Sequence, residues 1–340
     1  MGKTIKIAFF STKEYDKKIF DKYNKKYNYD ITYLDSQLNA ETAPLAKGYD
    51  AVCVFVNDVV DKETIKILKE NNVKLIALRC AGFNNVNVKA LDENIKAVRV
   101  PAYSPNAVAE HATALLLEIN RKIYKAYQRT KKYNFTLNGL LGFDICGKTV
   151  GVMGTGKIGK VFCKIMKGFG ANVIAYDVYE DKEAEEQIGF KYVTLDTLLA
   201  KSDIISIHCP LTKENEDIIN DETINKMKKG VIIINTSRGK LVDSASLIKG
   251  LENGKISGAG LDVYDEESEY FLNDMSMEYK RDRNLSVLLS MPNVIITSHQ
   301  AFFTKEALNK IAEDTCQNIK DIFETGSCVN EVKWEVEIGK

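Results

Sequence analysis

The chain has 340 residues, 45% hydrophobic and 28% charged, and its 47 basic residues balance its 47 acidic residues. This length allows two domains with sizeable cores, and the composition is typical of a soluble globular protein. Zero formal net charge gives no general attraction to nucleic acid or to an anionic membrane. Because no apolar run has membrane-spanning length, we expect neither kind of partner.

The seven cysteines show no C-x-x-C motif and no regular pairing, and several lie inside apolar runs. We therefore expect buried thiols, with no disulfide framework and no metal site. The N-terminal residues run directly into a strand pattern and do not resemble a signal peptide. These features indicate a reducing, cytoplasmic location.

The first hundred residues alternate short apolar strands with helical segments, which predicts a parallel sheet covered on both faces. The strands are expected at 5–10, 29–34, 50–56, 74–80 and 96–100, and the helices at 12–27 and from 61 to 71.

A long helix is expected from Pro105 roughly to Lys132, with Ser104 as a favourable N-cap. Its segment Ala112 to Leu117 is apolar on most sides, which predicts burial between domains or between subunits. His111 lies on this helix, and its sequence context favours a packing role over a functional one.

An apolar strand pattern at 149–153 leads into the glycine motif Gly154, Gly156 and Gly159, and a helical pattern follows. The first glycine allows a tight turn, the second lets backbone approach a pyrophosphate, and the third lets helix and strand pack closely. The helix N-terminus favours the anion. A second strand ends in Asp177, whose carboxylate suits a ribose 2′-hydroxyl and repels a 2′-phosphate. The motif therefore predicts NAD rather than NADP.

Further strands are expected at 203–210, 231–235, 257–263 and 293–299, with helices at 221–229, 243–252 and 304–325. Open parallel sheets bind ligands beyond the carboxyl ends of their strands. The side chains suited to chemistry stand at those ends: Asp177, His208, Arg238, Asp262 and His299.

Reduction of a 2-oxo acid with a nicotinamide requires a cation for the carboxylate and carbonyl, and a proton donor for the oxygen. Arg238 suits the first requirement, because a guanidinium binds planar oxygens bidentately. His299 suits the second, with His208 as its rival. An acid bonded to the other imidazole nitrogen would orient the donor and favour its charged form.

With Glu267 added, the chain resembles the D-2-hydroxyacid dehydrogenases, most of all their fermentative bacterial D-lactate branch. The similar motifs follow the family's order over nearly the whole chain, at 78–85, 100–106, 109–111, 154–159, 208–211, 235–239, 260–264 and 298–302. The resemblance implies an α/β fold of two Rossmann-like, doubly wound parallel-sheet domains. An NAD-binding domain, 102–299, is inserted into a discontinuous substrate domain, 1–101 and 300–340, with the active site in the cleft.

The resemblance also implies roles for single residues. Arg238 binds the substrate carboxylate and carbonyl, Glu267 pairs with His299, and His299 is the acid/base. Many relatives have Glu-x-Glu where this chain has Asp265-Glu266-Glu267, which leaves Glu266 as an alternative partner. Implied substrate contacts are Ala81, Gly82, Tyr103, Arg238, His299 and Phe302. Implied NAD contacts are Gly154, Gly156, Lys157, Ile158, Gly159, Asp177, Cys209, Pro210, Asn215, Thr236, Ser237, Arg238 and Asp262.

The implied reaction is reversible hydride transfer between NADH and pyruvate, giving D-lactate, in a homodimer or a dimer of dimers. One alternative is a broader reductase that acts on larger 2-oxo acids such as 2-oxoisocaproate and phenylpyruvate. Another is a dinucleotide-sensing binding protein without turnover, similar to the corepressor branch of the family. The complete set of Arg, Glu and His argues against this last function.

Overall fold

The computed structural model describes residues 4–265, 267, 270–271, 274–278 and 282–333. The chain divides into two compact units: unit 1 is Met1–Ser104 with Thr304–Lys340, and unit 2 is Pro105–Phe303. The sequence placed these boundaries at 101/102 and 299/300. Residues 300 and 301 belong to unit 2 because their backbone N–H groups donate to Asp262.

Unit 1 is built on a five-stranded parallel sheet with the order β2-β1-β3-β4-β5. Its strands are β1 (Lys6–Phe9), β2 (Asp30–Tyr33), β3 (Ala51–Val54), β4 (Leu75–Leu78) and β5 (Lys96–Val98). Its helices are α1 (Glu14–Asn24), α2 (Lys62–Glu70) and α11 (Lys305–Thr325), with 3-10 turns η1 (Ala43–Ala46) and η2 (Val88–Ala90).

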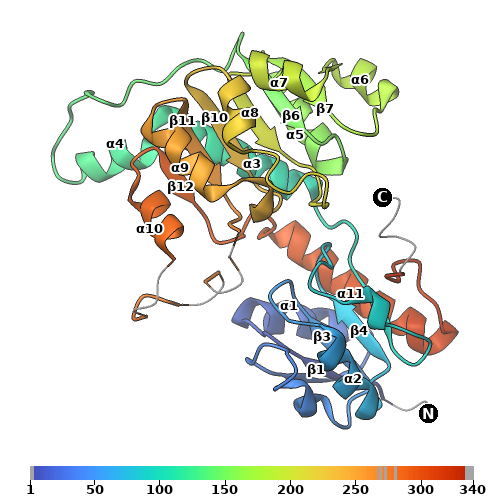
Figure 1. Ribbon diagram of the computed structural model, residues 1–340. Coiled ribbons are helices and arrows are strands. Elements are labelled where there is room, and N and C mark those ends of the chain that lie inside the picture. The colour runs from blue at the N-terminus through green and yellow to red at the C-terminus, as the bar shows by residue number, and fades with distance from the viewer. Residues whose placement is uncertain (1–3, 266, 268–269, 272–273, 279–281, 334–340) are drawn as a thin grey trace. The chain divides into compact units, whose positions relative to one another are not determined.

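The end of the chain returns to the first sheet. Helix α11, red in Figure 1, lies in the same unit as the blue N-terminal strands and contacts α1, β4 and β5. Thr304 caps this helix by accepting a hydrogen bond from the Ala307 N–H. Beyond the helix, Glu331 forms an antiparallel bridge with Val98. Unit 1 is therefore discontinuous in sequence.

Unit 2 is built on a seven-stranded parallel sheet with the order β12-β11-β10-β9-β6-β7-β8. Its strands are β6 (Thr149–Met153), β7 (Asn172–Tyr176), β8 (Lys191–Tyr192), β9 (Ile204–Ile207), β10 (Val231–Asn235), β11 (Ile256–Leu261) and β12 (Val294–Ile296). Its helices are α3 (Pro105–Arg121), α4 (Ile123–Thr130), α5 (Lys157–Gly168), α6 (Lys182–Ile188), α7 (Leu195–Lys201), α8 (Asp221–Lys226), α9 (Ser244–Glu252) and α10 (Arg283–Ser290), with 3-10 turn η3 (Gly239–Leu241).

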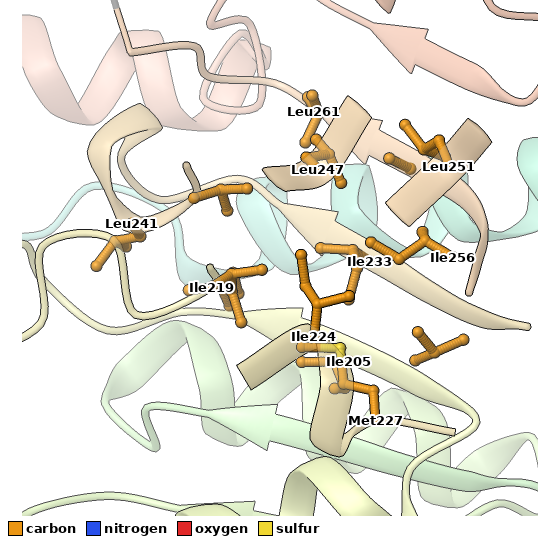
Figure 2. Packing of buried hydrophobic residues seen from close by; sticks show 14 of the residues in the cluster. Ile205, Ile219, Ile224, Met227, Ile233, Leu241, Leu247, Leu251, Ile256 and Leu261 are labelled. Atoms are coloured by element: carbon orange, nitrogen blue, oxygen red, sulfur yellow. The ribbon is translucent and has the colours of Figure 1, made fainter. Parts of the chain in front are cut away.

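Both faces of this sheet are covered, and successive strand residues pack into different cores. Ile233 lies in the cluster that α7, α8, α9 and α10 cover, whereas Ile232 and Ile234 lie in the cluster that α3, α5 and α6 cover. Figure 2 shows the first cluster, with Ile233 among side chains from several helices and strands. Double coverage explains why β10 is apolar throughout rather than alternating. The expected doubly wound parallel α/β fold is confirmed.

The single helix expected from Pro105 to Lys132 is wrong. Helix α3 ends at Arg121, because Lys122 adopts a left-handed backbone conformation with φ of 50°. The Lys122 ammonium donates to the Leu141 carbonyl, and the Glu118 carboxylate accepts from the Tyr124 N–H, so local bonds hold this break.

The apolar segment of α3 is also placed differently from the expectation. Ala112, Leu115 and Leu116 are buried in the core of unit 2 itself, and α3 contacts α5 and β11. These side chains are therefore not available to bury a subunit contact. None of the described helices is both long enough and apolar enough to cross a bilayer.

Candidate active site

The glycine turn after β6 has three different steric environments. Gly154 has φ of +92°, which favours glycine, and a Cβ there would lie 2.5 Å from the Cys209 nitrogen. A Cβ on Gly159 would lie 2.0 Å from the Gly154 carbonyl oxygen, whereas one on Gly156 would have no neighbour within 4 Å. Helix α5 starts at once, without a side-chain cap. The turn thus presents open backbone and uncapped helical N–H groups, as an anion site requires.

Asp177 lies directly beside this turn, at the end of β7. One carboxylate oxygen accepts from the Thr155 backbone N–H at 2.6 Å and from the Thr155 hydroxyl at 3.0 Å. The other oxygen accepts from the Tyr179 N–H at 2.9 Å. The Tyr192 hydroxyl lies 2.7 Å from that of Thr155. Sequence reasoning found Asp177 but assigned no role to Thr155 and Tyr192, because these hydrogen bonds join residues 22 and 37 positions apart and leave no local spacing signal.

The loops after β9 and β10 bond to one another. The Ser237 hydroxyl donates to the Cys209 carbonyl at 2.5 Å, which joins the two loops. Within the loop after β9, the Asn215 amide donates to the Pro210 carbonyl at 2.8 Å. Thr236 is buried, and its hydroxyl has no hydrogen-bond partner among the described residues. A buried hydroxyl of this kind needs a partner, which a bound ligand can supply.

His208 follows β9, with its Nε2 atom 2.9 Å from the Ser206 hydroxyl and its ring 4.9 Å from the ring of Phe162. Desolvation by this packing lowers the pKa of His208 to about 3. The imidazole is therefore neutral at physiological pH, and its one remaining N–H is too weakly acidic to serve as a proton donor.

Arg238 follows β10 on a loop that packs very closely against its neighbour. The next residue is Gly239, where a Cβ would lie 2.0 Å from the Tyr264 carbonyl carbon. The Asn235 amide donates to the Arg238 carbonyl at 2.8 Å, and one guanidinium nitrogen donates to the Ser237 carbonyl at 2.7 Å. Within the part of the chain that the structure describes, this guanidinium pairs with no carboxylate.

His299 and Glu267 form a direct pair, with Nδ1 of the imidazole 2.8 Å from Oε1 of the carboxylate. The other carboxylate oxygen accepts from the Tyr264 N–H at 3.0 Å. An ionised carboxylate only accepts hydrogen bonds, so Nδ1 carries a hydrogen. The Nε2 atom has no partner among the described residues. Glu266, the alternative acid, lies outside the described residues.

Asp262 directly follows β11 and is fully buried. It accepts from the Thr297 hydroxyl at 2.5 Å and from the Gln300 and Ala301 N–H groups at 2.9 and 2.8 Å. His111 Nε2 lies 3.4 Å from the same carboxylate. Burial acts to raise the pKa of Asp262, but the hydrogen bonds from His111, Thr297 and the two N–H groups outweigh it and lower that pKa. The carboxylate is therefore ionised.

Three sequence-assigned substrate contacts, Ala81, Gly82 and Tyr103, lie in unit 1, and each is half-buried. The Arg99 guanidinium donates to the Ala81 carbonyl at 2.8 Å, which fixes the turn after β4. In the described residues the N–H groups of Ala81 and Gly82 meet no acceptor. Phe302 is buried in unit 2, with its ring centroid 6.0 Å from that of Phe303.

Unit 2 thus brings Arg238, Asp262, Glu267 and His299 to the carboxyl ends of β10, β11 and β12, which are neighbours in the sheet. His111 of α3 also contacts this group through Asp262, whereas the sequence had favoured a packing role for this histidine. Among the described residues, no group of three or more His, Cys, Asp or Glu side chains is placed to hold a metal ion.

The chain is similar over most of its length to known proteins. The family of the D-isomer specific 2-hydroxyacid dehydrogenase NAD binding domain matches residues 113–301. The 2-hydroxyacid dehydrogenase homolog 1 of Schizosaccharomyces pombe is 50% identical over 319 residues, which cover 93% of this chain and 96% of the relative. The D-lactate dehydrogenase of Escherichia coli is 47% identical over 329 residues, which cover 96% and 100%.

The solved structure of the pyruvate reductase of Chlamydomonas reinhardtii is similar in fold as well as sequence. It has a TM-score of 0.88 and 46% identity, and the match covers 94% of this chain and 96% of that chain. The resemblance inferred from the motifs is confirmed. The chain is an oxidoreductase of the D-isomer specific 2-hydroxyacid dehydrogenase family, with its NAD-binding domain in unit 2.

Proposed function

We propose that this protein is a D-lactate dehydrogenase that reversibly converts pyruvate and NADH to D-lactate and NAD. The observation that carries the proposal is the 2.8 Å pair between His299 and Glu267. It leaves Nε2 of the imidazole without a partner among the described residues. Arg238, which has no carboxylate partner among them, follows β10, two strands from the β12 strand that precedes His299. A proton donor and a cation together are what a 2-oxo acid requires.

The residues of unit 2 fit the cofactor. Gly154, Gly156 and Gly159, with Lys157 and Ile158 at the start of α5, would hold the pyrophosphate, and Asp177 would accept from the adenosine ribose. Cys209, Pro210 and Asn215 would line the cofactor, and Thr236, Ser237, Arg238 and Asp262 would lie nearer the nicotinamide. The partnerless hydroxyl of Thr236 supports this placement. When bound, NADH supplies the hydride.

The chain's own side chains handle charge and protons. Arg238 binds the substrate carboxylate and polarises the carbonyl, because a guanidinium presents donors in a planar fork. His299, protonated on both nitrogens, donates its Nε2 proton to the carbonyl oxygen as that oxygen gains charge. The Glu267 carboxylate stabilises the imidazolium and holds its orientation. In lactate oxidation His299 takes the hydroxyl proton back.

Other assigned residues would shape the substrate site. The partnerless N–H groups of Ala81 and Gly82 suit a carboxylate, and the Tyr103 hydroxyl would add a hydrogen bond. Phe302 would bound the pocket for the substrate side chain. We propose pyruvate, rather than 2-oxoisocaproate or phenylpyruvate, as the substrate. The chain's high similarity to a D-lactate dehydrogenase and to a pyruvate reductase supports this choice.

The exposed apolar side chains of residues 123–141 support a homodimer, or a dimer of such dimers. They include Tyr133, Leu137 and Leu141, which are 88%, 80% and 88% exposed. A concentration of large exposed apolar residues marks a protein contact. This segment, rather than Ala112 to Leu117, is the proposed dimer surface.

A cytoplasmic location is also proposed. All seven cysteines are free thiols, and four of them, Cys53, Cys80, Cys163 and Cys316, are buried. Free thiols persist in reducing compartments.

Replacing the proton donor should abolish most turnover. We expect His299→Gln to lower kcat for pyruvate reduction by about 10³-fold. His208→Gln should lower it by less than about tenfold, because a neutral imidazole bonded to Ser206 cannot donate the proton. Stopped-flow NADH oxidation measures both. Equal losses in the two variants would contradict the assignment of His299.

The glycine turn offers a matched pair of substitutions. Gly159→Ala should destabilise the ligand-free protein by about 3 kcal/mol, since the added Cβ overlaps the Gly154 carbonyl. Gly156→Ala should leave the ligand-free melting temperature nearly unchanged and weaken NADH binding about tenfold or more. Thermal melts and NADH fluorescence titration separate the effects. Unchanged NADH affinity in Gly156→Ala would remove the pyrophosphate role of this turn.

A substrate panel tests the choice of 2-oxo acid. We expect kcat/KM for pyruvate with NADH to exceed that for 2-oxoisocaproate and phenylpyruvate, and to exceed that for pyruvate with NADPH. Larger side chains need pocket volume, and NADPH would place its phosphate against Asp177. A preference for phenylpyruvate would favour the broader reductase. Tight NAD binding without turnover of any 2-oxo acid would favour the dinucleotide-sensing protein.

The dimer surface is tested with charge. The double variant Leu137→Asp, Leu141→Asp should sediment as a monomer where the unmodified protein sediments as a dimer or larger, because burying two carboxylates is costly. Val329→Asp, at a residue of unit 1 that is 94% exposed, is the control and should keep the assembly. An unchanged sedimentation coefficient in the double variant would exclude this surface.

A further inference from the structure

A chain of hydrogen bonds within unit 2 connects helix α3 to the turn that carries His299. The Nε2 atom of His111 lies 3.0 Å from the Thr297 hydroxyl oxygen and 3.4 Å from Asp262 Oδ1. Thr297 Oγ1 in turn lies 2.5 Å from the same Asp262 oxygen. Both partners of His111 are close to His299. Thr297 precedes it by two residues, and Asp262 accepts hydrogen bonds from the two residues that follow it.

The direction of these bonds follows from the donor inventory. An ionised Asp262 only accepts, so the single hydroxyl hydrogen of Thr297 points to Asp262. The Thr297 oxygen can then only accept from His111. His111 must therefore carry a hydrogen on Nε2.

The turn needs support because its backbone conformation is unfavourable. His299 has φ of 51°, in the left-handed region, which costs a residue with a Cβ roughly 1 kcal/mol or more. The Asp262 carbonyl accepts from the His299 N–H at 2.8 Å, and its carboxylate accepts from the Gln300 and Ala301 N–H groups. Asp262 thus binds the backbone N–H groups of His299 and of the two residues that follow it.

We propose that His111 is a positioning residue for His299. Its Nε2–H donates to Thr297 and keeps the Asp262 carboxylate in the orientation that holds the turn, so that the imidazole meets Glu267 at 2.8 Å. Without this donor, the Thr297 oxygen loses its donor and the buried carboxylate loses a neighbouring N–H, so both are held less firmly. The catalytic consequence rests on the proposed function, whereas the effect on the geometry of His299 does not.

Two substitutions separate donation from packing. His111→Leu removes the N–H but keeps an apolar side chain in the same place. His111→Gln keeps an amide N–H near the position of Nε2. If His111 only fills space, Leu should be tolerated as well as Gln; if it positions the turn, only Gln should be tolerated.

The chain has three histidines, so selective ¹³C and ¹⁵N labelling of histidine yields three sets of ring signals. Replacing each histidine in turn with Gln assigns them. In the ligand-free protein, we expect His111 to show a hydrogen on Nε2. The ring signals of His299 should shift in His111→Leu and stay in place in His111→Gln.

Kinetics supply the second readout. His111→Leu should lower kcat for pyruvate reduction about tenfold and leave KM for NADH within about twofold, while His111→Gln should keep most of kcat. Thr297→Val should reproduce the Leu variant and Thr297→Ser should not. Glu110→Gln changes the exposed neighbour of His111 on α3 and should alter neither readout.

The outcomes are distinguishable. Unchanged His299 signals in both His111→Leu and Thr297→Val would overturn the inference, as would a Gln variant that behaves like Leu. If His111→Leu does not fold, Thr297→Val still tests the inference, because it breaks the chain from His111 to Asp262 and unchanged His299 signals there would overturn it. Absence of pyruvate reduction by the unmodified protein would overturn the proposed function alone, because the ring signals are read without substrate.

Discussion

A buried, ionised carboxylate at the end of β11 is the constraint on which the candidate site depends. Asp262 is excluded from solvent, and such a charge is tolerated only where donors surround it. Its donors are Thr297 and the N–H groups of Gln300 and Ala301, with His111 Nε2 close by. One charge therefore ties together the ends of β11 and β12 and the side of α3. His299 lies in the middle of the chain segment that it binds.

The two ends of the site are built by different means. At the glycine turn the site is formed by the backbone. Because glycine has no side chain, the N-terminus of α5 is left open, and the Thr155 N–H donates to Asp177 beside it. At the strand ends of β10 to β12, side chains hold other side chains, as Glu267 holds His299. The first arrangement suits binding of an anionic group of a cofactor by backbone N–H groups. The second suits proton transfer, which depends on the tautomer and orientation of one imidazole.

Much of this was predictable because parallel strands bring their carboxyl ends to one edge. Val231–Asn235, apolar throughout, predicted a strand buried on both faces, and Thr304 and Asp243 predicted helix starts that the structure confirms. The break between α3 and α4 at Lys122 was not predictable, because the sequence has no proline or glycine there. The break is held by hydrogen bonds that involve Glu118 and Leu141. The apolar segment Ala112 to Leu117 likewise predicted burial but not the surface that covers it, because that surface comes from distant parts of the chain.

The sequence by itself determined the fold class, the position of the dinucleotide turn and the chemical types available at the strand ends. Hydrophobic periodicity and glycine spacing involve residues that are close in sequence, so they can be read without the structure. Only the tertiary structure decided the surroundings of the two histidines at the strand ends, because burial and a bonding partner both come from distant residues. Burial lowers the pKa of His208 to about 3, whereas His299 is oriented by the hydrogen bond that its Nδ1 donates to Glu267. The tertiary structure also brought His111 to Thr297, because this contact joins residues 186 positions apart and no spacing encodes it.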